Sequence, residues 1–179
     1  MNNYQIIIVC DEQGNPTGEY IPKEVGHSGE GKRHFGATVL LYNSHGQILL
    51  QRRKHQNFDD IWCFTGDTHR LHTDNGDESF EEATERCLKI EYGIEERVDL
   101  KNLGTFNYFA KIDGRCENEN CAMMVGEYNG EIIMNEDTAY EYKWVEKKDF
   151  LTDFAANPQK YAPWIPGGLN ILKEKGFFR

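Results

Sequence analysis

The chain has 179 residues, enough for a domain with a sizeable core, and its 30 acidic and 20 basic side chains give a net charge of −10. This acidic balance, with a pI near 5.1, argues against nucleic acid and against an anionic membrane as partners. The length predicts one domain over residues 1–179. No apolar run reaches the ~18 residues of a membrane-spanning helix, so we expect no membrane partner.

The first residues and the cysteines indicate a cytoplasmic protein. The apolar run at residues 4–10 is too short for a signal peptide and lacks a basic flank. The cysteines are odd in number and scattered, and they fit neither a disulfide framework nor a zinc pattern. They are Cys10, Cys63, Cys87, Cys116 and Cys121.

The first third of the chain predicts strands. Residues 4–10 form an apolar run that ends at the turn-like segment DEQGNPTG, and residues 26–36 are a glycine-rich loop or strand edge. Residues 35–42 and 47–51 are strand-like around NSHG, which predicts a hairpin. Residues 59–69 predict another strand that leads into a loop.

A helix is predicted in the middle of the chain, within residues 76–94. Ser79 and Glu82 form a capping box at its start, and Gly93 stands where it should end. One face is apolar and carries Phe80, Ala83, Cys87 and Ile90. The other face is charged and carries Glu78, Glu82, Glu85, Arg86 and Glu91. Charge alone favours an ordinary solvated amphipathic helix.

Strands and helices alternate again after this helix. Residues 103–111 and 117–128 predict strands around the turn at Asp113 and Gly114, and residues 140–145 predict a further strand. Residues 148–155 and 165–175 predict short helices. Strands on both sides of a central helix indicate an α/β fold, a mixed β-sheet sandwich flanked by helices.

Histidines and carboxylates recur at spacings that suit a divalent metal. His27 and His34 lie in the glycine-rich segment, where a single histidine is more often structural or solvated. Glu117 and Glu119 alternate along a predicted strand, so both carboxylates share one face, which is costly without a cation or solvent. With His69 these side chains suit an octahedral site, where imidazole favours Mn²⁺, Fe²⁺ or Zn²⁺ and oxygen favours Mg²⁺.

The central helix resembles the Nudix box, a Gly and a Glu followed by R-E-U-x-E-E-x-G-U. The matching residues are Glu78, Arg86, Glu91, Gly93 and Ile94. Three box positions differ: the leading Gly falls on His72, and two helical Glu positions fall on Cys87 and Ile90. In Nudix hydrolases those carboxylates hold the catalytic metals. Their absence suggests the branch that does not rely on them, the type I isopentenyl-diphosphate isomerases.

An ordered series of motifs over nearly the whole chain is similar to that isomerase family. Each motif alone is weak, and their order makes the resemblance specific. The series is K-x-x-x-H-x6-H (Lys23, His27, His34), R-R (Arg52, Arg53), W-x6-H (Trp62, His69), E-x-E-x-C (Glu117, Glu119, Cys121) and P-W (Pro163, Trp164).

The resemblance implies a Nudix-type mixed-sheet fold and a metal-dependent enzyme. The implied ligands of its divalent metal, Mn²⁺ or Zn²⁺, are His27, His34, His69, Glu117 and Glu119. Glu91 would face a second ion, the Mg²⁺ that accompanies the substrate diphosphate.

It also implies residues that contact a small-molecule diphosphate. Lys23 and Arg53 would contact the phosphate oxygens, although a solvated surface charge is an equal alternative for Arg53. Trp164 would close over the hydrocarbon tail and stabilise a carbocation-like state through its ring face. Tyr108 matches an active-site tyrosine of the family. Ordinary core packing is an equal alternative for both aromatic residues.

One position departs from the family in its chemistry. The family has its catalytic Cys two residues before the third histidine, and here that residue is Asp67. On a continuous strand, at ~3.3 Å per residue, Cys63 would lie about 13 Å from Asp67. We therefore do not expect the Cys63 thiol to take the place of the family's catalytic Cys. Isomerisation needs two opposed groups for proton transfer, and Glu119 and Asp67 are the candidates. Aspartate ordinarily accepts a proton far better than it donates one, unless burial raises its pKa.

Three functions follow from these patterns. The first is an isomerase that interconverts isopentenyl and dimethylallyl diphosphate with Asp67 in place of the thiol. The second is a Nudix hydrolase that cleaves a diphosphate with metal-activated water, which Cys87 and Ile90 oppose and Glu78, Glu82 and Glu91 favour. The third is a binding homologue that has lost its chemistry.

Overall fold

The computed structural model describes residues 5–178. The strands are β1 (Ile6–Cys10), β2 (Pro16–Pro22), β3 (His34–Tyr42), β4 (Ile48–Arg53), β5 (Trp62–Cys63), β6 (Gly66–His69), β7 (His72–Thr73), β8 (Gly76–Asp77), β9 (Lys101–Ile112), β10 (Arg115–Glu127) and β11 (Ala139–Val145). The helices are α1 (Lys23–Gly26), α2 (Phe80–Tyr92), α3 (Lys147–Ala156), α4 (Ile165–Glu174) and the 3-10 turn η1 (Pro158–Lys160).

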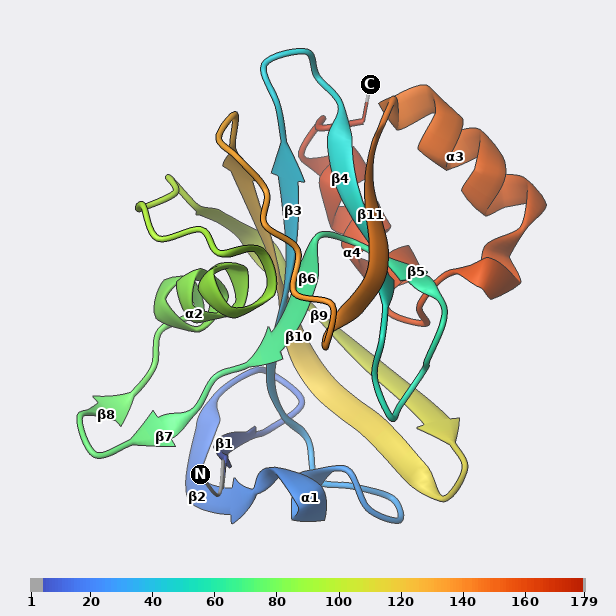
Figure 1. Ribbon diagram of the computed structural model, residues 1–179. Coiled ribbons are helices and arrows are strands. Elements are labelled where there is room, and N and C mark those ends of the chain that lie inside the picture. The colour runs from blue at the N-terminus through green and yellow to red at the C-terminus, as the bar shows by residue number, and fades with distance from the viewer. Residues whose placement is uncertain (1–4, 179) are drawn as a thin grey trace.

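Strand β3 is the centre of a mixed sheet, as Figure 1 shows. It pairs in parallel with β10 and antiparallel with β1, β4 and β6. The sheet continues through β2, β5, β9 and β11, while β7 and β8 form a separate hairpin. The predicted mixed-sheet α/β fold is therefore confirmed.

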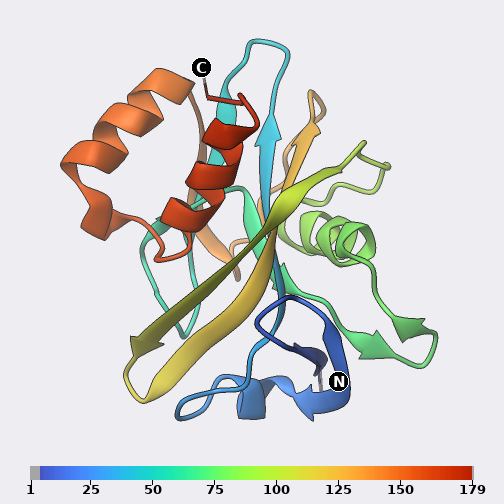
Figure 2. The same cartoon turned by 180° about the vertical axis from the view of Figure 1, so that it is seen from behind.

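Helices cover both faces of the sheet, with α2 on one side and α3 and α4 on the other (Figures 1 and 2). Alternate residues of β3 therefore enter two separate cores. Val39 packs in the core that holds Leu88 of α2, and the next residue, Leu40, packs in the core that holds Leu169 of α4. A strand buried on both faces has no polar alternation, which explains the continuous apolar run at this position.

Helix α2 begins and ends as predicted, but its buried face differs. Ser79 and Glu82 form the capping box, and Gly93 ends the helix with a φ of 65°, in the left-handed region that favours glycine. Ile90, which we expected on the buried face, is 52% exposed. The helix rests on the sheet through residues spaced by about four, and Ile90 lies to one side of them. Those residues are Ala83, Thr84, Cys87, Leu88 and Tyr92.

Two strand predictions needed correction. Residues 16–18, expected to belong to the turn-like segment DEQGNPTG, instead begin strand β2, because an edge strand that is mostly exposed carries no apolar alternation. The single strand expected over residues 59–69 is two short strands, since β5 pairs with β4 and β6 pairs with β3. The chain changes partner between them at the buried residues Phe64 and Thr65.

The α1 helix and the short hairpin were not predicted, and residue 4 of the first predicted strand lies outside the described residues. The helices predicted at 148–155 and 165–175 correspond to α3 and α4. Within residues 5–178 no helix has both the length and the apolar character needed to cross a membrane.

Candidate functional site

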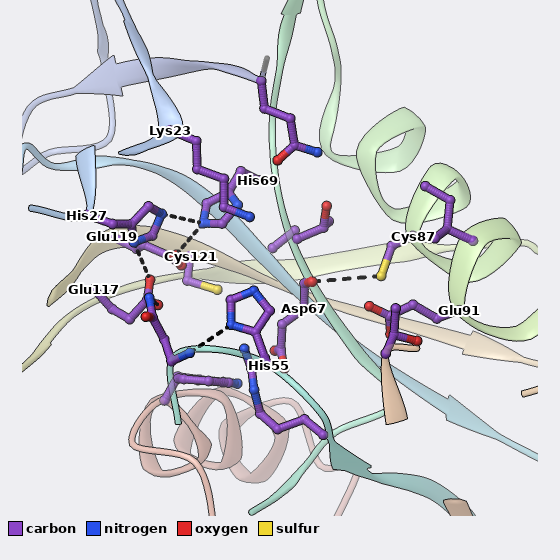
Figure 3. Close-up of a pocket in the computed structure, with 18 of the residues that line it drawn as sticks. Lys23, His27, His55, Asp67, His69, Cys87, Glu91, Glu117, Glu119 and Cys121 are labelled. Atoms are coloured by element: carbon purple, nitrogen blue, oxygen red, sulfur yellow. Dashed lines mark hydrogen bonds and ion pairs between the residues drawn. The ribbon is translucent and has the colours of Figure 1, made fainter. Parts of the chain in front are cut away.

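A pocket of about 280 Å³ collects side chains from strands, helices and the loop after β4 (Figure 3). Every predicted site residue except His34 lines it, and His34 is fully buried and within 3.7 Å of Glu119, which lines the pocket. The motifs that are scattered through the sequence therefore meet in one place.

Strand register explains this convergence. On β3, Gly36 is opposite His69 of β6 on one side and opposite Cys121 of β10 on the other. Because side chains alternate with a period of two, Asp67 shares the face of His69, and Glu119 shares the face of Cys121. The two carboxylates therefore flank β3 on one face of the sheet.

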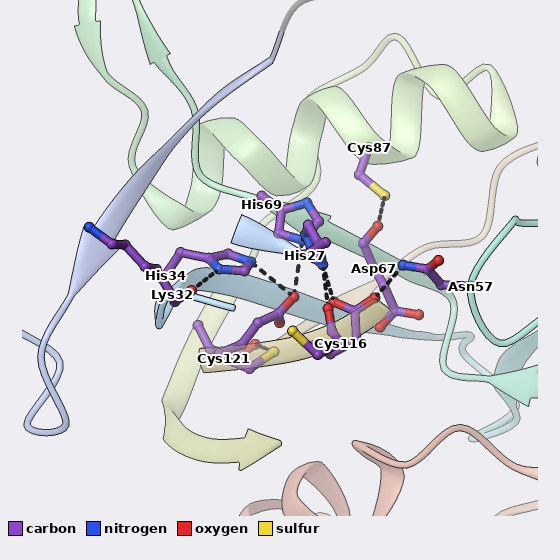
Figure 4. Close-up of polar contacts among 12 residues, drawn as sticks. His27, Lys32, His34, Asn57, Asp67, His69, Cys87, Cys116 and Cys121 are labelled. Carbon is purple, nitrogen blue, oxygen red and sulfur yellow. Dashed lines mark hydrogen bonds and ion pairs between the residues drawn. The ribbon is translucent and has the colours of Figure 1, made fainter. Parts of the chain in front are cut away.

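Three imidazoles and one carboxylate form a tight group (Figure 4). The Nε2 atoms of His27 and His69 are 3.1 Å apart, and His69 Nε2 is 3.0 Å from Glu119 Oε1. His34 Nε2 is 3.7 Å from the same oxygen. The ligand atoms of these four residues all lie within 4.8 Å of one another. Such a set of nitrogen and oxygen donors is typical of a transition-metal site.

The hydrogen bonds of the other ring nitrogens turn the Nε2 atoms toward this group. His34 Nδ1 donates to the Lys32 carbonyl at 2.7 Å, and His27 Nδ1 lies 2.9 Å from the Cys116 carbonyl. Carbonyl partners of this kind fix the tautomer of a metal-binding histidine. His34 Nε2 is buried and has no hydrogen-bond partner within the described residues. Burial lowers the pKa of His69 well below its usual value, so the His69 ring is neutral. These residues fit a divalent metal.

Glu117 lies outside the group of four, although the resemblance implied it as a ligand. Its Oε2 is 3.0 Å from His27 Nδ1, and its Oε1 accepts a hydrogen bond from Asn57 Nδ2 at 3.3 Å. Residues two positions apart on a strand, such as Glu117 and Glu119, are separated by ~6.6 Å. Glu117 therefore reaches the Nδ1 side of the His27 ring, while Glu119 lies on the side of its Nε2. In this arrangement Glu117 orients His27.

Gly36 makes room for Glu119. A Cβ at position 36 would lie 1.9 Å from Glu119 Oε2. Only a residue without a side chain lets this carboxylate cross its neighbouring strand. Burial raises the pKa of Glu119, but its interactions with the His34 and His27 rings outweigh burial, and the net shift is downward.

Asp67 has an unusual environment for an aspartate. Arg53 Nη1 donates to its Oδ2 at 3.4 Å, while its Oδ1 is buried and has no hydrogen-bond partner among residues 5–178. Burial raises the pKa of Asp67 to about 6, against the opposing charge of Arg53. The carboxyl group therefore exchanges a proton closer to neutral pH than an exposed aspartate does.

The expected separation between Cys63 and Asp67 was wrong. The break between β5 and β6 folds the chain back, so that each of the two side chains shifts the pKa of the other. The Cys63 thiol itself donates to Gln51 at 3.6 Å. Burial and the charge of Asp67 raise the pKa of the Cys63 thiol well above its usual value. Cys63 is therefore a neutral neighbour of Asp67 and is fully buried.

Glu91 turns from α2 into the pocket, whereas its position suggested the charged outer face. Gln51 Nε2 donates to its Oε2 at 2.8 Å. Burial raises the pKa of Glu91 to about 7, although the Gln51 hydrogen bond opposes the shift. A Cβ at Gly66 would lie 2.9 Å from Cys87 Sγ and 3.1 Å from Glu91 Oε2, so glycine permits this approach.

Aromatic side chains and cations form the rest of the wall. Trp164 is 2% exposed, and its ring centroid is 5.8 Å from that of Tyr108 and 5.9 Å from that of Phe58. The Arg53 guanidinium lies 4.9 Å from the Trp164 ring and is 9% exposed, which excludes a solvated surface charge. Trp164 is both part of the core and part of the pocket. Lys23 also lines the pocket.

Sequence reasoning missed several residues of this wall. Gln51, His55 and Asn57 lie at the end of β4 or in the loop after it, and Cys87 lies on α2. The available signal was their position beside the Arg52-Arg53 pair, because loops that follow a rigid strand often carry function.

Comparison with known proteins agrees with this geometry. Residues 32–165 match the NUDIX domain. The chain is 29% identical over 164 residues to an isopentenyl-diphosphate Delta-isomerase of Klebsiella pneumoniae, covering 89% of this chain and 85% of that protein. It is 27% identical over 167 residues to isopentenyl-diphosphate Delta-isomerase 2 of Aromatoleum aromaticum, and the match covers 92% of this chain and 84% of that protein.

Solved structures share the fold. DR0079 from Deinococcus radiodurans matches with a TM-score of 0.71 and 16% identity, covering 98% of this chain and all of that one. An Ap4A hydrolase of C. elegans matches with a TM-score of 0.54 and 17% identity, and the match covers 80% of this chain and 96% of that one. Since the matched family segment spans most of the sequence, this chain belongs to the NUDIX domain family.

Proposed function

We propose that this protein is a metal-dependent isomerase that interconverts isopentenyl and dimethylallyl diphosphate. The observation that carries the proposal is the placement of two carboxylates, Asp67 and Glu119, on one sheet face on either side of β3. The group of three histidines and Glu119 adjoins them, and the aromatic wall of Tyr108 and Trp164 borders the same pocket.

The reaction moves one double bond and conserves all atoms. A proton is added to the terminal carbon of the double bond, and another is removed from the carbon nearer the diphosphate. One group must donate and an opposed group must accept, and their roles exchange in the reverse direction. Asp67 and Glu119 are the proposed pair, with the Tyr108 hydroxyl next to Glu119 across the β9–β10 register.

The remaining residues hold the substrate and the metals. His27, His34, His69 and Glu119 would bind a Mn²⁺ or Zn²⁺ ion, and Glu117 would orient His27 or complete the ligand set. Such an ion would supply positive charge that stabilises neighbouring anions. Glu91 would face the Mg²⁺ of the diphosphate, and Lys23 and Arg53 would contact the phosphate oxygens. The face of Trp164 would stabilise positive charge on the tail.

A diphosphate hydrolase is the second candidate, and Glu91 is the observation that favours it. This carboxylate occupies a Nudix-box position, lines the pocket and has a pKa raised by burial to about 7. Cys87 and Ile90 oppose this function, because the helix then offers few carboxylates for metals. A binding homologue without chemistry is the third candidate. We place the protein in the cytoplasm, where its free buried thiols would stay reduced.

Products separate these candidates. The purified protein should be incubated with isopentenyl diphosphate and Mg²⁺ or Mn²⁺, and the mixture assayed for dimethylallyl diphosphate and for free phosphate. The isomerase predicts rearranged product without phosphate release. Phosphate release would favour the hydrolase, and unchanged substrate at saturating binding would favour the binding homologue.

A further inference from the structure

Gln51 is a buried polar residue of the pocket wall that the proposed reaction does not use. It lies on β4, lines the pocket and is 3% exposed. Its side-chain amide lies between the Cys63 thiol and the Glu91 carboxylate and makes a hydrogen bond with each of them. Because unpaired polar groups are costly in a protein interior, these two contacts account for the burial of the amide.

The two partners determine which way the amide points. A carboxylate oxygen accepts hydrogen bonds, so the Nε2 end of Gln51 faces Glu91 Oε2, at 2.8 Å. The other end, Oε1, accepts from the Cys63 thiol at 3.6 Å. The amide is therefore fixed in one orientation, with its donor on Glu91.

Glu91 is held on one side only. Its Oε2 carries the Gln51 hydrogen bond and also packs against β6, where a Cβ at Gly66 would lie 3.1 Å away. The second oxygen of the carboxylate, Oε1, is the one left for a ligand. In Figure 3, Glu91 lies on the α2 side of the pocket, away from His27 and Glu117.

The orientation of Glu91 decides what α2 can offer to a cation. The other described residues of this helix that line the pocket are Arg86, Cys87 and Ile90, and none of these is a carboxylate. A single carboxylate oxygen that must meet an ion from a helix needs a fixed position, and hydrogen bonds to a ligating carboxylate supply it.

We propose that Gln51 is a positioning residue that ties Glu91 Oε2 to β4 and so presents one oxygen, Oε1, to a divalent cation in the pocket. The proposal rests on the cation role of Glu91 in the proposed function and deepens it, because it assigns the orientation of that carboxylate to a residue of β4. The alternative is a structural role, in which Gln51 only fills the space beside β5 and accepts from Cys63.

Substitutions of similar shape separate these roles. Gln51→Met keeps the length of the side chain and removes the donor, while the Cys63 thiol keeps the backbone carbonyl of residue 51, at 3.6 Å, as an acceptor. Gln51→Leu gives the same test if Gln51→Met does not fold. Gln47→Met is the matched control, because Gln47 Nε2 also donates to a carboxylate, Glu146 Oε1 at 2.9 Å, but on the surface.

The measurement is the affinity of each full-length protein for Mn²⁺, by electron paramagnetic resonance, with Zn²⁺ already bound and inorganic pyrophosphate present. Zn²⁺ binds nitrogen and oxygen ligands more tightly than Mn²⁺ does, so it occupies the histidine group and leaves the Glu91 side for the probe. Gln51→Met should weaken Mn²⁺ binding about tenfold, as loss of a hydrogen bond to a metal ligand does. Gln47→Met should bind Mn²⁺ like the native protein.

A Glu91→Gln background shows whether Gln51 acts through Glu91. Glu91→Gln alone should weaken Mn²⁺ binding, and adding Gln51→Met to it should cause no further loss. A structural role predicts the same loss in both backgrounds. That result, or native Mn²⁺ affinity in a folded Gln51→Met or Glu91→Gln protein, would overturn the proposal.

Turnover of isopentenyl diphosphate, measured in parallel, tests the proposed function separately. If the native protein does not isomerise it but Gln51→Met weakens Mn²⁺ binding only when Glu91 is present, the isomerase assignment fails and the role of Gln51 stands. If the native protein isomerises it and Gln51→Met leaves Mn²⁺ affinity unchanged, only the role of Gln51 fails.

Discussion

Asp67 is the residue whose chemistry the proposed function depends on most. Its Oδ1 is buried and has no hydrogen-bond partner in the part of the chain that the structure describes, and burial raises the pKa of Asp67 to about 6. An unpartnered carboxyl oxygen of this kind is available to a substrate. The sequence alone identified the substitution of the family's thiol, but it could not give the burial that changes how this carboxyl group behaves.

Replacing Asp67 should change isomerisation in two directions. Asp67→Asn removes the proton-transfer group and should lower kcat for isopentenyl diphosphate about 100-fold or more. Asp67→Cys should raise kcat, because a thiol in this buried position holds a proton and can also give it up. The measurement is the rate of dimethylallyl diphosphate formation, with Asp74→Asn, in an exposed turn, as the control. An Asp67→Asn protein with native turnover would contradict the assignment of Asp67.

His55 should make the fold sensitive to acid. Its folded pKa of about 4 lies below the ~6.5 of an unfolded histidine, so between these values the unfolded chain binds the proton and the folded chain does not. Stability should therefore fall as the pH drops through this window, by at most ~1.4 kcal/mol per pH unit from this group. His55→Asn should lose less stability than the native protein between pH 6.5 and 4, by urea unfolding. Identical losses would contradict the burial of a neutral His55.

At the scale of single residues, motif spacing found the side chains but not their partners. The resemblance implied that His27, His34 and His69 share a site with Glu119, and their ligand atoms lie within 4.8 Å of one another. Spacing could not show that Glu117 contacts the other nitrogen of His27, because period two along a strand gives a shared face and not the reach of each side chain. His55 had no periodic signal at all.

Among the elements, β3 sets the geometry of the site through its register with β6 and β10. Gly36 is the position on β3 where the Glu119 carboxylate passes over the backbone. A side chain at this position must displace either the strand or the carboxylate.

Gly36→Ala should therefore lose metal before it loses the fold. Its Cβ would lie 1.9 Å from Glu119 Oε2, and displacing this proposed ligand should weaken metal affinity about tenfold or more. The check is metal content by mass spectrometry beside circular dichroism. Gly126→Ala on β10 is the control, because its Cβ would meet Val98 at 2.8 Å, far along the strand from Glu119. Equal metal content in Gly36→Ala and the native protein would remove this role of Gly36.

How well an element was predicted depended on the physical signal it carries. Helix α2 has local signals at both ends, the capping box at Ser79 and Gly93 in the left-handed region, and its bounds were found. Strand β2 is polar and exposed, so its sequence resembles a turn. The break between β5 and β6 arises from a change of partner strand, which is a long-range event with no local marker.

For the whole molecule, the proposed metal site joins parts of the chain that are distant in sequence. His27 follows α1, His34 begins β3, His69 ends β6 and Glu119 lies on β10. An ion bound by all four would link the residue after α1 to three neighbouring strands at one end of β3. A ligand that binds only the folded state raises its stability.

Removing the metal should therefore destabilise the whole fold. At a metal concentration of about 100 Kd the stabilisation is ~2.7 kcal/mol, which corresponds to roughly 5–10 °C in Tm for a chain of this size. Treatment with a chelator should lower Tm by this amount, and added Mn²⁺ or Zn²⁺ should restore it. His69→Ala should lower metal content and show a smaller chelator effect. A Tm that does not respond to chelation in a protein shown to contain metal would contradict this role.

The central claim is that protein groups add a proton at one end of the substrate double bond and remove one at the other. The most direct measurement is turnover of isopentenyl diphosphate in D₂O with Mg²⁺ and Mn²⁺, followed by proton NMR. The proposed isomerase predicts dimethylallyl diphosphate with solvent deuterium in a methyl group, and Asp67→Asn should abolish that label. Release of phosphate without a labelled rearranged product, in a protein that retains its metal, would contradict the claim and favour a diphosphate hydrolase.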